Sequence, residues 1–267
     1  MEIKEWTYEE YPAFEEEVEG AVRIPTTGDE PGTYIYSNVE YANMDGVPLH
    51  LQIITPQTRN TKNKDNKYSC LVYVQGSAWL KQNINAKLGL LARLAEKGYV
   101  IAVVEYRHSG IAPFPAVAID TRNAIRFMKQ HSAEYMVDAD VKGIISFYGA
   151  NSMMLPDGTP STLNHHLPDS PEGKEMGGVN LREHPELCRK MSVECNVDEQ
   201  TKLPPVLMFH GTKDKTINPR VSVTVYNRLK QCGKDVKLYF LEGADHGGSE
   251  FLTEEVQRIV MEFMNKV

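Results

Sequence analysis

A short apolar run that ends in a turn of small residues constrains the fold of this chain most. Residues 71–74 read Leu-Val-Tyr-Val, and residues 75–79 read Gln-Gly-Ser-Ala-Trp directly after them. This composition predicts a buried strand that stops at a tight turn. The turn would leave N–H groups free to hold an anion, and the amides of Ser77 and Ala78 are the candidates. An ordinary strand-to-helix turn, with Trp79 as packing, explains the same residues equally well.

Strands and helices alternate along the rest of the chain. Asp45-Gly46 lies between two apolar, alternating runs and is typical of a β-hairpin. Pro115 begins a helix at its favoured first position. Further buried strands are predicted at residues 99–104, 141–148, 206–209 and 236–241, with amphipathic helices between most of them. The pattern predicts an α/β protein with a mostly parallel central sheet, an N-terminal antiparallel hairpin and helices on both faces.

Composition favours one domain and disfavours several partners. With 267 residues that are 41% hydrophobic, the chain can bury one large core, so a single domain over residues 1–267 is expected. A net charge of −7 gives no reason to expect nucleic acid or an anionic membrane as a partner. The acidic first residues do not resemble a secretion signal, so a cytoplasmic location is expected. Residues 149–205 are rich in Pro, Gly, Asp and Glu, and we expect a cap-like insertion there.

Other charged and metal-binding residue types give weaker signals. The Glu-rich residues 1–30 are expected to be a solvated face, and the polar residues 58–67 an exposed loop. The pair His165-His166 has no carboxylate or cysteine at metal-ligand spacing, and no cofactor or metal is expected. Four cysteines lie far apart and are interpreted as thiols: Cys70, Cys188, Cys195 and Cys232.

Two polar residues follow the last two predicted strands. Asp214 comes after strand 206–209, and His246 comes after strand 236–241. Neighbouring parallel strands bring their loops to the same edge of a sheet. There a carboxylate can orient an imidazole and stabilise its protonated form, as in a hydrolytic triad. Although a lone His or Asp in a loop is usually structural, the ordered pair predicts Asp214 and His246 as the catalytic acid and base.

Several motifs occur in the order of a known family. Residues 74–79 resemble a variant of a His-Gly-Gly-Gly-Trp oxyanion motif, and later landmarks are matched by residues 105–109, 112–116, 146–149, 210–214 and 243–248. In these motifs the chain resembles the α/β-hydrolase esterases of the hormone-sensitive-lipase and carbohydrate-esterase type, including acetylxylan and feruloyl esterase-like proteins. The resemblance implies hydrolysis of a small acyl or carbohydrate ester by a serine esterase. It also implies an oxyanion hole at Ser77 and Ala78, with Trp79 as a substrate contact.

The nucleophile of such an enzyme is missing from the sequence. A serine should project from a sharp turn with the pattern Gly-x-Ser-x-Gly, and no such pattern is present. In the family, a segment ending like Asp140 leads into a central strand, the elbow and a helix, whereas here Val141 follows at once. About 30 to 45 residues are absent if these elements have usual lengths. The empty position would leave two rows of backbone groups unpaired.

Two explanations of the gap have different consequences. In the first, strand 141–148 moves into the empty position and Ser152 becomes a makeshift nucleophile, although no glycine follows it. In the second, the natural protein has residues between Asp140 and Val141 that this sequence lacks, and the intact flanking motifs favour this explanation. If the chain is complete, we predict no acyl-enzyme turnover. The alternatives are then a non-catalytic hydrolase-fold binding protein and, more distantly, a metal hydrolase.

Overall fold

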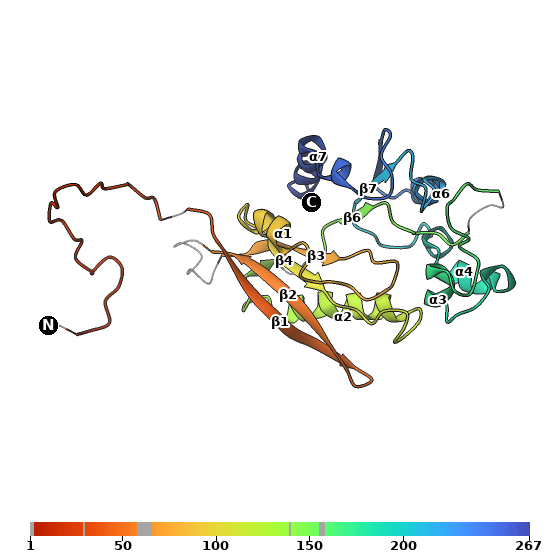
Figure 1. Ribbon diagram of the computed structural model, residues 1–267, viewed down its shortest axis with the longest axis horizontal. Helices are drawn as coiled ribbons and strands as arrows, with labels where there is room; N and C mark the ends of the chain where they lie inside the picture. Colours follow the sequence, from red (N-terminus) through yellow and green to blue (C-terminus); the bar gives the residue numbers. More distant parts are fainter. Residues whose placement is uncertain (1–2, 29, 58–65, 139, 155–157) are drawn as a thin grey trace.

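The computed structural model describes residues 3–28, 30–57, 66–138, 140–154 and 158–267, whose strands form two hydrogen-bonded sheets (Figure 1). The first sheet has the order β1-β2-β4-β3-β5, with β1 (Thr33–Met44), β2 (Val47–Pro56), β4 (Val100–Val104), β3 (Tyr68–Val74) and β5 (Val137–Asp138). The second has the order β6-β7-β8, with β6 (Ile144–Phe147), β7 (Val206–Gly211) and β8 (Val236–Leu241). β2 pairs antiparallel with β1 and β4, and the other pairs are parallel.

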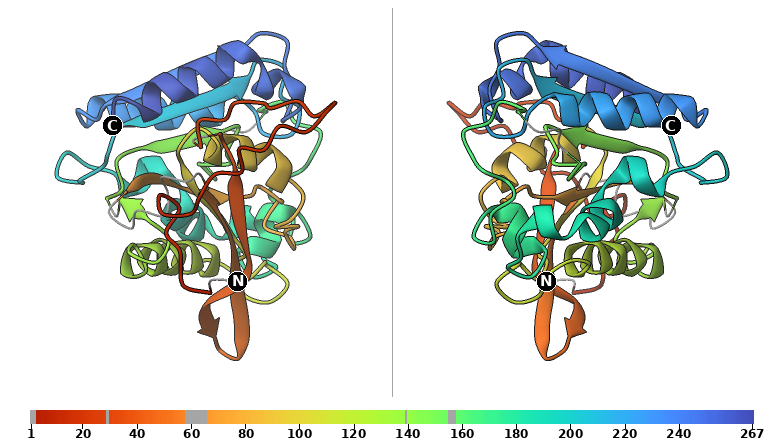
Figure 2. Two further views of the ribbon diagram at one scale, coloured as in Figure 1. Left: turned by 90° about the vertical axis from the view of Figure 1, so that its left-hand side faces the viewer. Right: turned by 90° about the vertical axis from the view of Figure 1, so that its right-hand side faces the viewer.

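The hairpin of β1 and β2 forms where the sequence predicts it. Asp45 and Gly46 have φ angles of 57° and 84°, and the register partners Met44 and Val47 flank them. Positive φ at both central residues is what a two-residue hairpin turn requires. The hairpin and the C-terminal elements lie at opposite ends of the molecule (Figure 2).

Helices cover both faces of each sheet, as the alternation of strand side chains requires. In β4, Val100, Ala102 and Val104 pack toward α2 (Ala116–Gln130), whereas Ile101 and Val103 pack toward α1 (Leu88–Ala95). In the second sheet, the two faces of β7 pack toward α6 (Arg220–Gln231) and α7 (Glu254–Met264). Val260 of α7 contacts clusters of both sheets, so this helix joins them.

The predicted class is confirmed: the chain is an α/β protein with an antiparallel hairpin, parallel strands and helices on both faces. The described strands form two hydrogen-bonded sheets and not one continuous sheet. Among them, β6 pairs with β7 alone, so strand 141–148 has not moved beside β3. The sheet is interrupted at this point because no hydrogen bonds of the described strands join β3 to β6.

The insertion, residues 149–205, contains short helices that the sequence did not predict. They are α3 (Pro171–Glu175), the 3-10 helix η2 (Leu181–Glu183), α4 (Pro185–Met191) and α5 (Val193–Asn196). Their apolar side chains form a small cluster against Trp79 and Phe114. A further 3-10 helix, η3 (Ser249–Leu252), precedes α7.

The outer segments add little to the core. Residues 3–28 are exposed, apart from partial burial of Trp6 and Gly28, and extend away from the body (Figure 1), which agrees with the prediction of a solvated stretch. Most of the loop predicted at residues 58–67 lies outside the described residues. No described helix combines the length and apolar character needed to cross a membrane.

Candidate functional site

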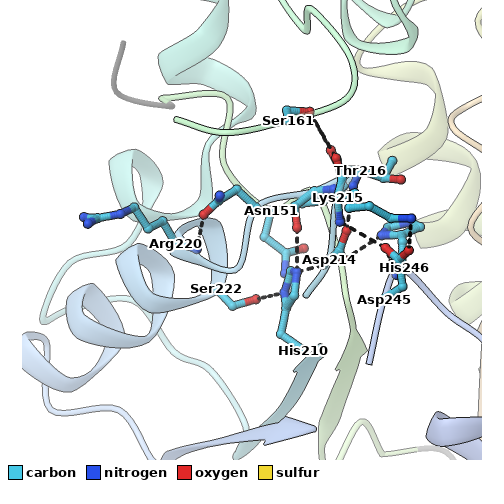
Figure 3. Close-up of polar contacts among 12 residues, drawn as sticks. Asn151, Ser161, His210, Asp214, Lys215, Thr216, Arg220, Ser222, Asp245 and His246 are labelled. Carbon is cyan, nitrogen blue, oxygen red and sulfur yellow. Dashed lines mark hydrogen bonds and ion pairs between the residues drawn. The ribbon is translucent and has the colours of Figure 1, made fainter. Parts of the chain in front are cut away.

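Asp214 and His246 meet beyond the ends of β7 and β8 (Figure 3). Nδ1 of His246 lies 2.8 Å from Oδ2 of Asp214. The Asp214 side chain is fully buried, whereas 32% of the His246 side chain is exposed. A buried carboxylate behind a partly exposed imidazole is the arrangement in which the carboxylate orients the ring and stabilises its protonated form.

The carboxylate of Asp214 is held by four groups. Oδ1 accepts the N–H groups of Thr216 at 2.9 Å and Ile217 at 2.8 Å. Oδ2 lies 2.8 Å from His246 and 3.0 Å from Nε2 of His210. Burial alone would raise the pKa of Asp214, but the hydrogen bonds from His210, His246 and Ile217 outweigh it and hold the pKa below the usual range. Asp214 is therefore an anion at neutral pH.

His210 contacts both the acid and the backbone after it. It is completely buried, and its Nε2 lies 2.8 Å from the carbonyl oxygen of Ile217. Since a carbonyl only accepts, Nε2 carries a proton, and Nδ1 lies 2.7 Å from the hydroxyl of Ser222. His210 thus fixes Asp214 and the backbone after it, but its contact with the same oxygen as His246 was not predicted.

A second carboxylate joins the two loops that carry the acid and base. Oδ1 of Asp245 accepts the N–H groups of Lys215 at 3.0 Å and His246 at 2.8 Å. Its Oδ2 lies 2.8 Å from Nζ of Lys215. This ion pair and the amide hydrogen bonds lower the pKa of Asp245 to about 2. We name residues 212–218 the acid loop, and Asp245 ties it to His246.

Among the described residues, an aromatic ring and not a serine packs against His246. The rings of Tyr148 and His246 are 4.8 Å apart at an interplanar angle of 63°. Among the described residues, no serine hydroxyl hydrogen-bonds to this imidazole. Ser152 is buried, and its hydroxyl bonds to the carboxylate of Glu194. Its role as a makeshift nucleophile remains a prediction without a contact to the base.

The turn after β3 retains free donors. Within the described structure, the N–H groups of Ser77 and Ala78 have no hydrogen-bond acceptor. The Ser77 hydroxyl contacts the carbonyl of Leu80 at 2.6 Å and the hydroxyl of Tyr106 at 2.9 Å. Ala78 and Trp79 both have positive φ, at 53° and 55°. No hydrogen bond or ion pair of the described residues links this turn to His246, so the oxyanion hole remains a prediction.

Trp79 lies beside the insertion. It is half-buried and packs against the cluster of Met153, Met176, Leu181 and Cys188. This packing was the alternative to the predicted substrate contact. The contact itself remains a prediction.

Sequence spacing failed to identify the partners of several histidines. His165 forms an ion pair with Glu172, its Nδ1 lying 2.8 Å from Oε1, although no carboxylate partner was expected. Glu172 could not be identified from the sequence, because it reaches the His165 ring only through a turn and the first residues of α3. Asp-Ser-Pro-Glu at 169–172 was the available signal, since Ser170 caps α3 by accepting the N–H of Gly173. The described residues contain no group of three or more ligands that could hold a metal ion.

The interrupted sheet and the pair at the ends of β7 and β8 define a protein of the α/β-hydrolase class. The chain belongs to the BD-FAE family, whose model matches residues 53–141 and 138–229. Both matched segments include part of the predicted machinery. The first contains the turn after β3, and the second contains Asp214.

Individual relatives agree with this class. The chain is 23% identical to the probable isoprenylcysteine alpha-carbonyl methylesterase ICMEL1 of Arabidopsis thaliana over 251 residues, 75% of this chain and 52% of that protein. It therefore spans about half of that relative's length. A truncated carbohydrate esterase from gut microbiota has a similar fold, with a TM-score of 0.68 and 21% identity over 90% of this chain and 98% of that chain.

A propionate-bound esterase of Thermogutta terrifontis is also similar. Its TM-score is 0.63, with 21% identity over 92% of this chain and 97% of that chain. Likenesses at this level of identity show that the fold is that of an α/β-hydrolase.

Proposed function

We propose that this chain is the scaffold of a serine-type carboxylic-ester hydrolase. The observation that carries the proposal is the 2.8 Å contact between His246 and the buried Asp214. The names of the similar proteins support the ester as substrate, since they include a methylesterase and a carbohydrate esterase. The donors that hold Asp214 as an anion prepare it to stabilise a protonated His246.

The proposed chemistry is acyl transfer through a serine. Nε2 of His246 takes the proton of the serine hydroxyl while the serine oxygen attacks the ester carbonyl carbon. The N–H groups of Ser77 and Ala78 stabilise the oxyanion. His246 then gives the proton to the leaving alcohol, and water releases the acyl group by the reverse sequence.

The serine belongs to a segment that we place between Asp140 and Val141. Burial of the strands supports this placement: β4 and β7 are buried throughout, whereas β3 and β6 have no buried residue. Central strands of parallel sheets are buried on both faces. Leu71 of β3 and Ile145 of β6 nevertheless pack into the same cluster beneath α7, which supports an empty position between them.

The comparisons support the same placement independently. The family model matches in two segments, and these meet at residues 138–141. The Arabidopsis alignment spans 251 positions but covers 75% of the 267 residues, about 200, so about 50 positions fall opposite gaps in this chain. That total is close to a strand, an elbow, a helix and their loops.

The proposed substrate is a small acyl or carbohydrate ester. Names of similar structures support this class, among them an acetyl ester-xyloside bifunctional hydrolase from Caldicellulosiruptor lactoaceticus. The packing of Trp79 with the insertion gives the turn after β3 an aromatic wall, and such walls suit sugar and acyl groups. We propose the insertion as the cap of the site.

A non-catalytic binding protein is the second candidate for these 267 residues. The observation that favours it is the lack of a described serine hydrogen-bonded to His246. Such a protein binds esters saturably and leaves them intact, whereas the hydrolase with its serine segment turns them over.

Activity of the 267-residue chain tests the placement of the nucleophile. We expect no turnover of p-nitrophenyl acetate and no stoichiometric labelling by a fluorophosphonate. The His246→Gln variant serves as the matched control for background reaction. Hydrolysis by the parent chain that disappears in this variant contradicts the proposal, because the nucleophile would then lie among these residues.

A further inference from the structure

A second series of serine, histidine and carboxylate lies in the insertion. Oγ of Ser161 is 2.8 Å from Nε2 of His165, and Nδ1 of His165 is 2.8 Å from Oε1 of Glu172. His165 and Glu172 are only 7% and 4% exposed, whereas Ser161 is exposed. By spacing alone, this series has the form of a nucleophile, base and acid.

The neighbours of Ser161 assign the protons differently. Its Oγ lies 3.2 Å from the carbonyl oxygen of Thr216 and 3.4 Å from that of Lys215, and carbonyls only accept hydrogen bonds. The close contact with Glu172 raises the pKa of His165, against the effect of burial. The Ser161 hydroxyl has one hydrogen, which it donates to the carbonyl of Thr216, so Nε2 of His165 is the donor in its contact with Ser161. A serine with this polarity is no nucleophile.

These hydrogen bonds connect Ser161 to the backbone that holds Asp214. Thr216 accepts from Ser161 through its carbonyl, and its own N–H donates to Oδ1 of Asp214 at 2.9 Å. Beside it, Thr162 donates its N–H and its hydroxyl to the carbonyl of Lys215, at 2.9 and 3.0 Å. Figure 3 shows Ser161 reaching the acid loop on the side away from His210. The insertion thereby hydrogen-bonds to two successive carbonyls of the acid loop, those of Lys215 and Thr216.

Packing joins the same two parts. A cavity of about 10 Å³, close to the space of one water molecule, is lined by His165 and Glu172 of the insertion and by Ile217 of the acid loop. The N–H of Ile217 is the second backbone donor to Oδ1 of Asp214. A displacement of His165 would therefore reach both amides that hold the acid.

We propose that His165, acting through Ser161, is a positioning residue that fixes the acid loop and thereby the orientation of Asp214. The carboxylate of Glu172, 2.8 Å from Nδ1, favours the charged and donating form of His165. The inference rests on the proposed function only in treating Asp214 as the acid, because the contacts themselves do not depend on catalysis. It gives the insertion a role in the geometry of the acid and base as well as in covering the site.

Proton NMR of the 267-residue chain tests this role through the Nδ1–H of His246, which bonds to Asp214. The His246→Gln variant assigns the resonance. In Ser161→Ala we expect exchange of this proton with solvent to accelerate about two- to tenfold, the equivalent of one hydrogen bond. Ser161→Thr keeps a hydroxyl and should restore the parent rate, and Ser69→Ala, at an exposed position of β3, is the matched control.

His165→Phe should reproduce the effect of Ser161→Ala, and thermal unfolding identifies any variant that fails to fold. An unchanged exchange rate in folded Ser161→Ala overturns the proposal. So does fluorophosphonate labelling of Ser161 that depends on His165, because His165 would then accept the serine proton. Failure of the proposed esterase function leaves the exchange result unaffected, so the two outcomes can be distinguished.

Discussion

Neighbouring strands of this protein differ sharply in burial. Val104 of β4 is completely buried, whereas Val74, its register partner on β3, is 38% exposed. The second sheet repeats the difference, since Val206 of β7 is 7% exposed and its partner Ile144 of β6 is 38% exposed. The exposed member of each pair lies toward the interruption between the sheets. The comparison indicates that β3 and β6 have the apolar sequences of interior strands but are more exposed than their neighbours. On the side away from β4, β3 is paired only at Tyr68 and Ser69, with β5.

The largest expected effect comes from removing this difference. We expect a strand, a Gly-x-Ser-x-Gly elbow and a helix of the α/β-hydrolase pattern, grafted between Asp140 and Val141, to raise hydrolysis of p-nitrophenyl acetate by about 10⁴-fold or more, since loss of a nucleophile costs at least this much. The same graft with its elbow serine changed to alanine is the control. A well-folded graft that remains inactive would refute the assignment of His246 as the base.

A buried carboxylic acid near the turn after β3 should give the next largest effect. Glu175 of α3 is 1% exposed, and its Oε2 has no partner among the described residues. Burial raises its pKa from 4.5 to about 7, so the folded protein loses stability as the pH rises between these values. We expect Glu175→Gln to raise the free energy of unfolding by up to about 3 kcal/mol at pH 8 and very little at pH 4.5.

Urea unfolding at the two pH values measures this difference, with exposed Glu199→Gln as the control. A gain from Glu175→Gln that is equal at both pH values would show that ionisation is not its cause. The pH dependence reports whether the insertion excludes water from the carboxyl group of Glu175.

Paired valine substitutions test the comparison itself. We expect Val104→Ala to lower the free energy of unfolding by about 2 kcal/mol, through lost apolar burial and a cavity. Val74→Ala should cost less than about 1 kcal/mol, because its side chain is already partly in solvent. Denaturation midpoints at equal m-values provide the measurement. Equal costs for the two substitutions would show that β3 is packed like an interior strand.

The smallest expected effect concerns the backbone of the turn after β3. Ala78 has a φ of 53°, a conformation that glycine adopts without strain. We expect Ala78→Gly to raise the free energy of unfolding by about 0.5 kcal/mol, since relief of strain exceeds the added chain entropy. Ala118→Gly, on helix α2, should instead lower it by about 1 kcal/mol. Loss of stability in both variants would argue against the left-handed turn.

Local patterns predicted much of this fold. Asp45-Gly46 specified the hairpin because its backbone needs are local, and α2 begins one residue after the start predicted at Pro115. The pairing of Asp214 with His246 followed from the topology of consecutive parallel strands, which also depends on few choices. The missing motif led us to expect unpaired backbone groups at an empty position, and the described strands are indeed not joined between β3 and β6.

Other features depend on chain reversals that no period reveals. Glu172 reaches His165 only because Ser170 and Pro171 start a one-turn helix. Glu175 lies in a polar stretch that favours exposure, and only packing of the insertion buries it. Asp245 connects the two loops through contacts 30 residues apart in sequence, so its role was invisible beforehand.

Peptide mapping of the natural protein tests directly whether a further segment lies between Asp140 and Val141. Trypsin cleaves after Lys129 and Lys142, so residues 130–142 form one peptide that crosses the junction of Asp140 and Val141. We predict that this peptide is absent and that Asp140 continues into a segment containing Gly-x-Ser-x-Gly. Detection of the intact 130–142 peptide, with no version carrying an insertion, would contradict the account and leave these residues as a scaffold without its nucleophile.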